Sequence, residues 1–122
     1  MTDYLNQDDA LQIIGAAGFH VKDYGLLASA LARPATTLMG KEVYAGLDVK
    51  AAALLESVAR FHPMHDGNKR TAWLLTAVFV RMNGWKLSSE EPAYELMLDV
   101  AEGKLPLEGI ADGLRRLMLP LE

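Results

Sequence analysis

Residues 62–70 read HPMHDGNKR, and they separate two strongly helical, largely apolar segments of the chain. Gly67 and Asn68 place the start of the second helix inside this stretch. The first turn of a helix presents unpaired N–H groups and a partial positive charge, which together favour a bound anion. Lys69 and Arg70 add two full positive charges where cations disfavour the helix itself. The pattern therefore predicts an anion-binding site, with phosphate as the anion.

Two more side chains of the stretch supply the remaining groups of a phosphate-transfer site. Asp66 offers a hard oxygen ligand, and Mg²⁺ in proteins is usually held by one or two carboxylates together with phosphate oxygens. His62 is the one evident base, because imidazole is partly neutral near pH 7 and can take a proton from a hydroxyl group. The residues thus predict that phosphate and magnesium bind close to a general base.

Other interpretations of the stretch stay open on the residues alone. A solvated polar turn is the plainest, because Asp-Gly pairs are common in turns and Asn is a common helix N-cap. A metal site through His62 and His65 is a second, although the proline between them does not assure the two side chains a common face. A phosphohydrolase built on His65-Asp66 would need a distant histidine and aspartate, for which His20 and Asp99 are the candidates.

Length and composition limit the classes of protein to consider. The chain has 122 residues, 51% of them hydrophobic, which predicts a single domain over residues 1–122 with a real core. It has no cysteine, so disulfides and thiolate chemistry are excluded and a reducing cytoplasm is compatible. The acidic start, without a basic segment, is not expected to be a signal peptide, and no apolar run reaches the roughly 20 residues that span a bilayer. A formal net charge of −4 disfavours direct nucleic-acid binding.

Helical periodicity dominates the chain and predicts an all-α fold of about six helices. The expected helices cover residues 8–17, 23–32, 48–60, 68–83 and 90–102, and a last helix begins at Pro106. Asp48 is expected to cap the third helix, and Ser88 with Glu91 matches a capping box before the fifth. Segment 68–83 is apolar on nearly every side, which is typical of a buried central helix.

Residues 33–47 differ from the rest of the chain. This segment reads RPATTLMGKEVYAGL, with β-branched residues on both sides of Gly40. Such a pattern is typical of a loop or a short β-hairpin. It is the one predicted interruption of the helical architecture.

At this point the residues resemble a known family. HPMHDGNKR is similar to the pattern HPFx(D/E)GN(G/K)R of the Fic/Doc family, with Met64 where the family usually has phenylalanine. The following run TAWLLTAVFVRMNG and the earlier run LASALARP resemble the death-on-curing (Doc) branch. Lys69 in place of glycine, and Trp73 where AMP-transferring members have a second arginine, also resemble that branch. The resemblance extends from about Leu26 to the last helix.

The resemblance implies a fold and a set of roles. The fold is a Fic-like bundle of about six helices with a short β-hairpin flap. His62 is the implied catalytic base, Asp66 the Mg²⁺ ligand, and Gly67 to Arg70 the phosphate site for ATP. The flap docks the target chain by strand addition. In this chain, the implied flap residues are Thr36, Thr37, Leu38, Met39, Gly40 and Lys41.

The resemblance also implies a biological role and partners. Members of this branch are cytoplasmic toxins of toxin–antitoxin systems that transfer the γ-phosphoryl group of ATP to a hydroxyl of a translation factor, elongation factor Tu, and so inhibit translation. The family's internal inhibitory pattern (S/T)xxxE(G/N) is absent here, so an antitoxin protein is expected to supply the inhibitory segment. Two alternatives remain, an AMP transferase of the Fic type and a catalytically silent binding module.

Overall fold

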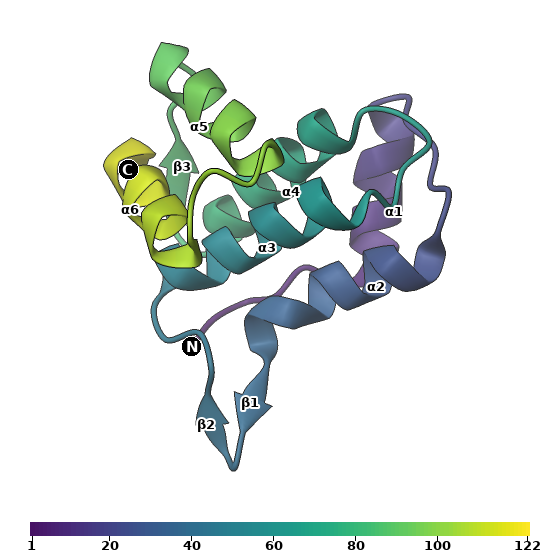
Figure 1. The fold of residues 1–122 in the computed structure, drawn as a ribbon. Helices are drawn as coiled ribbons and strands as arrows, with labels where there is room; N and C mark the ends of the chain where they lie inside the picture. The colour runs from purple at the N-terminus through teal and green to yellow at the C-terminus, as the bar shows by residue number, and fades with distance from the viewer.

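The computed structural model describes residues 1–122 and shows six α-helices with two small antiparallel sheets. Figure 1 shows the helices gathered into one body, from which a hairpin projects. The predicted mostly helical fold with a short hairpin is therefore confirmed. The helices are α1 (Gln7–Ala16), α2 (Tyr24–Ala32), α3 (Leu47–Phe61), α4 (Asn68–Met82), α5 (Glu91–Ala101) and α6 (Leu107–Leu117).

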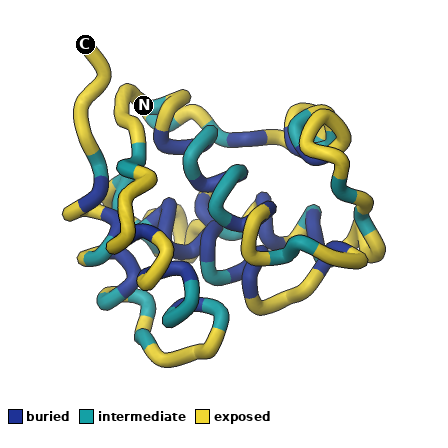
Figure 2. Tube along the Cα trace, turned by 90° about the horizontal axis from the view of Figure 1, so that it is seen from above, coloured by how far each residue is buried: buried dark blue, intermediate teal, exposed yellow.

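Helix α3 forms the centre of the bundle. It packs against α4 and α6 and also contacts α2 and α5. Nearly all its residues from Lys50 to Ala59 are buried, with the exception of Glu56. Figure 2 shows this buried centre, with exposed segments around it. Three consecutive alanines, Ala51 to Ala53, leave room for neighbouring helices to approach closely.

The expectation that segment 68–83 is buried on every side is wrong. Helix α4 buries one face, through residues such as Thr71, Leu75 and Phe79, while Trp73 and Leu74 on another face are partly exposed. The sequence pattern shows that a face is apolar, but it does not show whether another helix covers that face. The partly exposed face of α4 borders a cleft towards α5.

Two expected helix caps are also wrong. Helix α3 starts after Gly46, whose φ of 91° suits glycine, and Asp48 lies inside the first turn. The Asp48 carboxylate instead accepts a hydrogen bond from the Arg115 guanidinium of α6 at 2.9 Å. Before α5, the Ser88 hydroxyl accepts a hydrogen bond from the backbone N–H of Glu90, and no side chain caps the helix.

The loop or hairpin expected over residues 33–47 contains a hairpin. A short 3-10 turn (Arg33–Ala35) leads into strand β1 (Thr37–Leu38), which pairs with β2 (Lys41–Glu42). All residues of the two strands are exposed, and the hairpin stands away from the helices in Figure 1. The hairpin therefore has little packing of its own to hold it in place.

A second small sheet was not expected from the sequence. Strand β3 (Trp85–Leu87) follows α4 and pairs antiparallel with β4 (Met118–Pro120), which follows α6. Each strand has three residues, too few to show a period-two pattern. The pairing joins the end of the chain to the end of α4.

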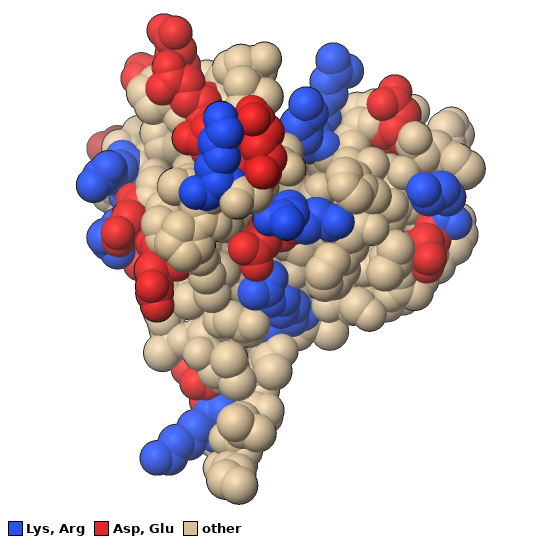
Figure 3. Space-filling view, viewed as in Figure 1, with Lys and Arg blue, Asp and Glu red and all other residues tan.

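Acidic and basic side chains are interspersed over the face that Figure 3 shows, without one continuous basic surface there. This mixture agrees with the small net negative charge of the chain. None of the six helices has the length and apolar character that crossing a membrane requires.

Candidate functional site

The stretch HPMHDGNKR forms the connection between α3 and α4, so both central helices position it. His62 follows the last residue of α3 and has φ 54° and ψ 54°, in the left-handed region. Histidine is one of the non-glycine residues that occur there more often than most. This backbone turn ends α3 and leaves the His62 side chain exposed to solvent.

Residues His20 to Asp23, a strap between α1 and α2, hold the connection in place through backbone hydrogen bonds. The Pro63 carbonyl accepts hydrogen bonds from the backbone N–H groups of Lys22 and Asp23, at 2.8 and 2.9 Å. The His65 N–H donates to the His20 carbonyl at 3.2 Å, and Val21 forms a β-bridge with Met64. The strap lies about 40 residues earlier in the chain, and no local pattern in the sequence indicated it.

The residue at the phenylalanine position of the family pattern acts as a packing anchor. Met64 is only 1% exposed and belongs to the main hydrophobic core. Its backbone N–H donates to the Asn68 side-chain oxygen at 2.9 Å, and the Asn68 amide donates back to the Met64 carbonyl at 3.3 Å. The Asn68 side chain thus joins the start of α4 to the Met64 backbone of the same connection.

Gly67 is required by both its backbone and its surroundings. It precedes the first residue of α4 with a φ of 74°, which most other residues avoid. A Cβ atom at this position would lie 2.5 Å from the Phe19 ring. The ring of Phe19 therefore packs directly against the backbone that opens α4.

The first turn of α4 is open towards solvent and carries unpaired charge. No side chain caps this helix, and the Thr71 N–H is the first to bond back, to the Gly67 carbonyl at 2.8 Å. Lys69 and Arg70 are exposed, and the ion pairs of the chain are made by other residues. Two unneutralised cations at an uncapped helix N-terminus favour a bound anion on electrostatic grounds.

Asp66 is the carboxylate that could hold a metal ion beside this turn. Its carboxylate is exposed, stands one residue before Gly67, and takes part in none of the ion pairs. A single free carboxylate beside a phosphate site fits Mg²⁺, which completes its shell with phosphate oxygens and water. The chain has no group of three histidine or carboxylate side chains placed to hold a metal by itself. The structure therefore gives no support to the two-histidine metal site or to the phosphohydrolase.

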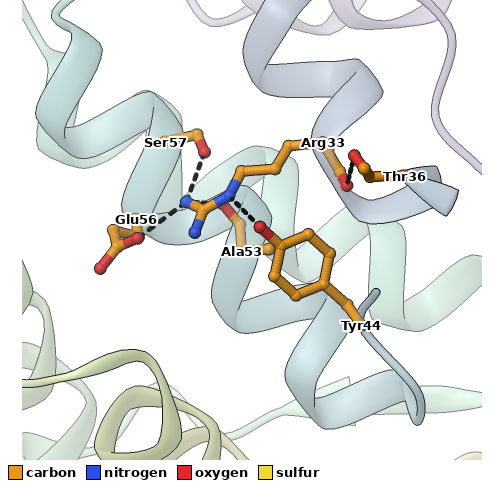
Figure 4. Close-up of polar contacts among 6 residues, drawn as sticks. All are labelled: Arg33, Thr36, Tyr44, Ala53, Glu56 and Ser57. Atoms are coloured by element: carbon orange, nitrogen blue, oxygen red, sulfur yellow. Dashed lines mark hydrogen bonds and ion pairs between the residues drawn. The ribbon is translucent and has the colours of Figure 1, made fainter. Parts of the chain in front are cut away.

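The flap hairpin is tied to α3 at its base by Arg33. Figure 4 shows the Arg33 guanidinium between the Tyr44 ring and α3. Its Nε donates to the Tyr44 hydroxyl at 2.9 Å, and the ring centroid lies 5.2 Å from the guanidinium carbon. Its Nη1 donates to the Glu56 carboxylate at 2.7 Å and to the Ser57 hydroxyl at 2.9 Å.

The contacts of Arg33 with Tyr44, Glu56 and Ser57 form a clasp at the base of the flap. The clasp joins both ends of the flap, since Arg33 precedes β1 and Tyr44 follows β2. Burial of the guanidinium lowers its pKa, but the hydrogen bonds with Tyr44 and Glu56 outweigh burial, so the pKa of Arg33 is raised above its ordinary value. Lys50 adds a second tie. The Lys50 side chain is 3% exposed, and its ammonium group donates to the Tyr44 carbonyl and the Glu42 carboxylate.

We expect Tyr44→Phe to loosen the flap while the helical body stays folded. The change removes the hydroxyl that accepts from Arg33 and keeps the ring over the guanidinium, at a cost of about 1.5 kcal/mol. Amide hydrogen exchange of residues 37–42 should become faster, because the exposed hairpin has few other contacts. Tyr24→Phe is the matched control, since Tyr24 is exposed on α2. Unchanged exchange in Tyr44→Phe would show that the clasp does not hold the flap.

Comparison with known proteins gives concordant matches. The sequence profile described as the Fic/DOC family matches residues 3–80. A protein named Toxin Doc from Mycolicibacterium smegmatis is 44% identical over 117 aligned residues, which cover 91% of this chain and 90% of the relative. A protein named Protein kinase doc from Escherichia phage P1 is 36% identical over 67 residues, 55% of this chain and 53% of the relative. The profile match includes the connection between α3 and α4, and the match to the first relative covers most of the chain.

Proposed function

This chain belongs to the Fic/Doc family, and we propose that it is a Doc-like toxin that transfers the γ-phosphoryl group of ATP to a protein hydroxyl. One observation carries the proposal. The uncapped first turn of α4, with Lys69 and Arg70 free of ion pairs, lies in the same short connection as His62 and Asp66. The names of the two relatives, a toxin and a protein kinase, support the same activity.

The proposed reaction assigns one task to each group. The His62 imidazole takes the proton from the target hydroxyl as its oxygen attacks the γ-phosphorus, while the bond from that phosphorus to the ADP oxygen breaks and ADP leaves with the electron pair. Lys69, Arg70 and the open N–H groups of α4 hold the phosphate oxygens and stabilise their charge. Mg²⁺ bound at Asp66 would neutralise part of the phosphate charge.

The flap is the proposed docking site for the target. Residues 36–41 are exposed, and a two-stranded hairpin has free edges that can pair with an extended segment of another protein. We propose a translation factor similar to elongation factor Tu as the target, with inhibition of translation as the result. An antitoxin protein is the proposed inhibitory partner, because one relative is named a toxin and the internal inhibitory pattern is missing from this chain. We propose that this pair acts in the cytoplasm.

The proposal predicts which phosphate is transferred. Incubation of the protein with Mg²⁺, elongation factor Tu and ATP labelled on the γ-phosphate should label the target, whereas ATP labelled on the α-phosphate should not. Lys69 is expected to favour this outcome, since a long cation at the second position of α4 holds a phosphate and occupies space that the opposite nucleotide orientation needs. Lys69→Gly should therefore reduce transfer of the γ label.

Each other result has a defined meaning. Transfer of the α label would make the chain an AMP transferase and Lys69 a surface cation. A purified Doc toxin serves as the positive control that the target can be modified. If this chain transfers neither label to such a target, a catalytically silent binding module is favoured. Full transfer of the γ label by Lys69→Gly would show that this lysine does not decide the orientation.

A further inference from the structure

All three histidines of the chain lie in two segments that contact each other. His62 and His65 belong to the connection between α3 and α4, and His20 begins the strap. The Val21–Met64 bridge is antiparallel, so the residue before Val21 stands opposite the residue after Met64. His20 and His65 therefore form a cross-strand pair, and the His65 N–H donates to the His20 carbonyl at 3.2 Å.

The register places both imidazoles of this pair on the solvent side of the bridge. Met64 is 1% exposed and Val21 packs against the core, so the two residues of the bridge face inwards. Side chains of an extended segment alternate between its two faces, and His20 and His65 are both exposed. Directly opposite side chains have Cβ atoms about 4.5–5.5 Å apart. At this separation, both rings can turn towards one point in the solvent.

Two imidazoles on neighbouring extended segments suit one transition-metal ion. Imidazole nitrogen is a ligand for Zn²⁺, Cu²⁺ and Ni²⁺, whereas Mg²⁺ prefers oxygen. Tetrahedral Zn²⁺, with Zn–N bonds of about 2.0 Å, needs two nitrogens about 3.3 Å apart, which rings at cross-strand separation can reach. No third histidine or carboxylate completes a cage around the pair. Water would fill the other positions, so the bound ion would exchange readily.

The acidic side chains next to the pair have other tasks. The Asp23 carboxylate accepts a hydrogen bond from the Leu26 N–H at 3.0 Å and so caps α2. Asp66 directly follows His65 and is the proposed Mg²⁺ ligand. A divalent ion on His65 would therefore stand close to Mg²⁺ on Asp66, and like charges at short range repel each other.

We propose that a divalent transition-metal ion such as Zn²⁺ binds between His20 and His65 and restrains phosphoryl transfer. The restraint, but not the binding, rests on the proposed function. The ion ties the strap to the connection, two segments that meet only in the folded chain, so it stabilises the fold. It restrains transfer because its charge lowers the affinity of Asp66 for Mg²⁺.

Titration calorimetry and thermal unfolding with Zn²⁺ alone test the site without any measurement of activity. Zn²⁺ should bind the native chain and raise its unfolding temperature, because the ion binds the folded state. His20→Ala and His65→Ala should each weaken this binding about tenfold or more, and the double variant should lose little beyond either single variant. Both side chains are exposed, so the variants should fold.

His62→Gly is the matched control for the binding measurement, because it removes the third histidine and leaves the pair intact. It should keep the native affinity for Zn²⁺. Native affinity in His20→Ala, or losses in the two single variants that multiply in the double variant, would overturn the shared site.

Transfer from γ-labelled ATP to elongation factor Tu tests the restraint. In the native chain, Zn²⁺ should raise the Mg²⁺ concentration needed for half-maximal transfer several-fold. In His20→Ala, which keeps every proposed site residue, this concentration should stay the same. An equal rise in both proteins would place Zn²⁺ at the magnesium site and overturn the restraint, as would no rise in either. If the native chain transfers no label even without Zn²⁺, the proposed function fails, and the binding measurements still decide the histidine site.

Discussion

His62→Gly should abolish toxicity and lower the rate of phosphoryl transfer about 10²–10⁴-fold, the usual contribution of a general base. Glycine is the informative replacement because His62 has a φ of 54°, which glycine adopts without steric cost. The fold should thus be at least as stable as in the native chain. Binding of ATP should persist, since the phosphates are held by the start of α4.

The measurements are growth arrest on induced expression, single-turnover transfer from γ-labelled ATP, and thermal unfolding. His62→Ala should be equally inactive, because it also lacks the imidazole. It should keep the strained backbone, so a difference in thermal stability between His62→Ala and His62→Gly measures the relief of strain. His65→Ala is the control within the same connection, because His65 is exposed and its backbone bond to His20 does not need the side chain. A stable His62→Gly protein with the native transfer rate would remove His62 from the reaction.

The sequence was sufficient for features that are contiguous in the chain. The two helices on either side of HPMHDGNKR have clear apolar periodicity, so the pattern predicted their positions to within one or two residues. The proposed site residues all lie within this one stretch, and their roles stay a prediction. The hairpin over residues 37–42 was recognisable for a similar reason, because it is a local break in helical period.

What the sequence could not indicate depends on residues that are far apart in the chain. The strap from His20 to Asp23 meets Pro63 and His65 only in the folded protein. Asp48 appeared to be a helix cap because its type suits that role, but its partner is Arg115, 67 residues later. Side-chain type gives the set of possible partners, and tertiary packing decides among them.

The cleft shows the same limit in the core. Trp73 and Leu74 sit in an apolar run whose pattern predicted a helix buried on all sides. Whether that face is covered depends on where α5 lies in the folded chain, and the structure leaves a cleft between α4 and α5. An apolar run therefore predicts the helix, but it does not show whether a face of that helix lies in the core or lines a cleft.

Arg70→Ala and Asp66→Asn should each lower phosphoryl transfer about 10²–10³-fold, the usual effect of removing one group that stabilises transition-state charge. Arg70→Ala removes a cation that binds phosphate, so the affinity for tripolyphosphate should fall as well. Asp66→Asn removes the charge of the proposed Mg²⁺ ligand, so transfer should require a higher Mg²⁺ concentration. Both side chains are exposed and free of ion pairs, and stability should change by less than about 0.5 kcal/mol.

The double variant tests whether the two groups act as one site. Because both stabilise the same phosphate charge, the loss in Asp66→Asn/Arg70→Ala should be much smaller than the product of the two single losses. Arg81→Ala is the matched control, since Arg81 is an exposed arginine of the same helix at its other end. It should leave transfer and tripolyphosphate binding unchanged. Multiplicative losses would mean that Asp66 and Arg70 act on separate steps, and native transfer by a folded Asp66→Asn protein would remove the magnesium role from this carboxylate.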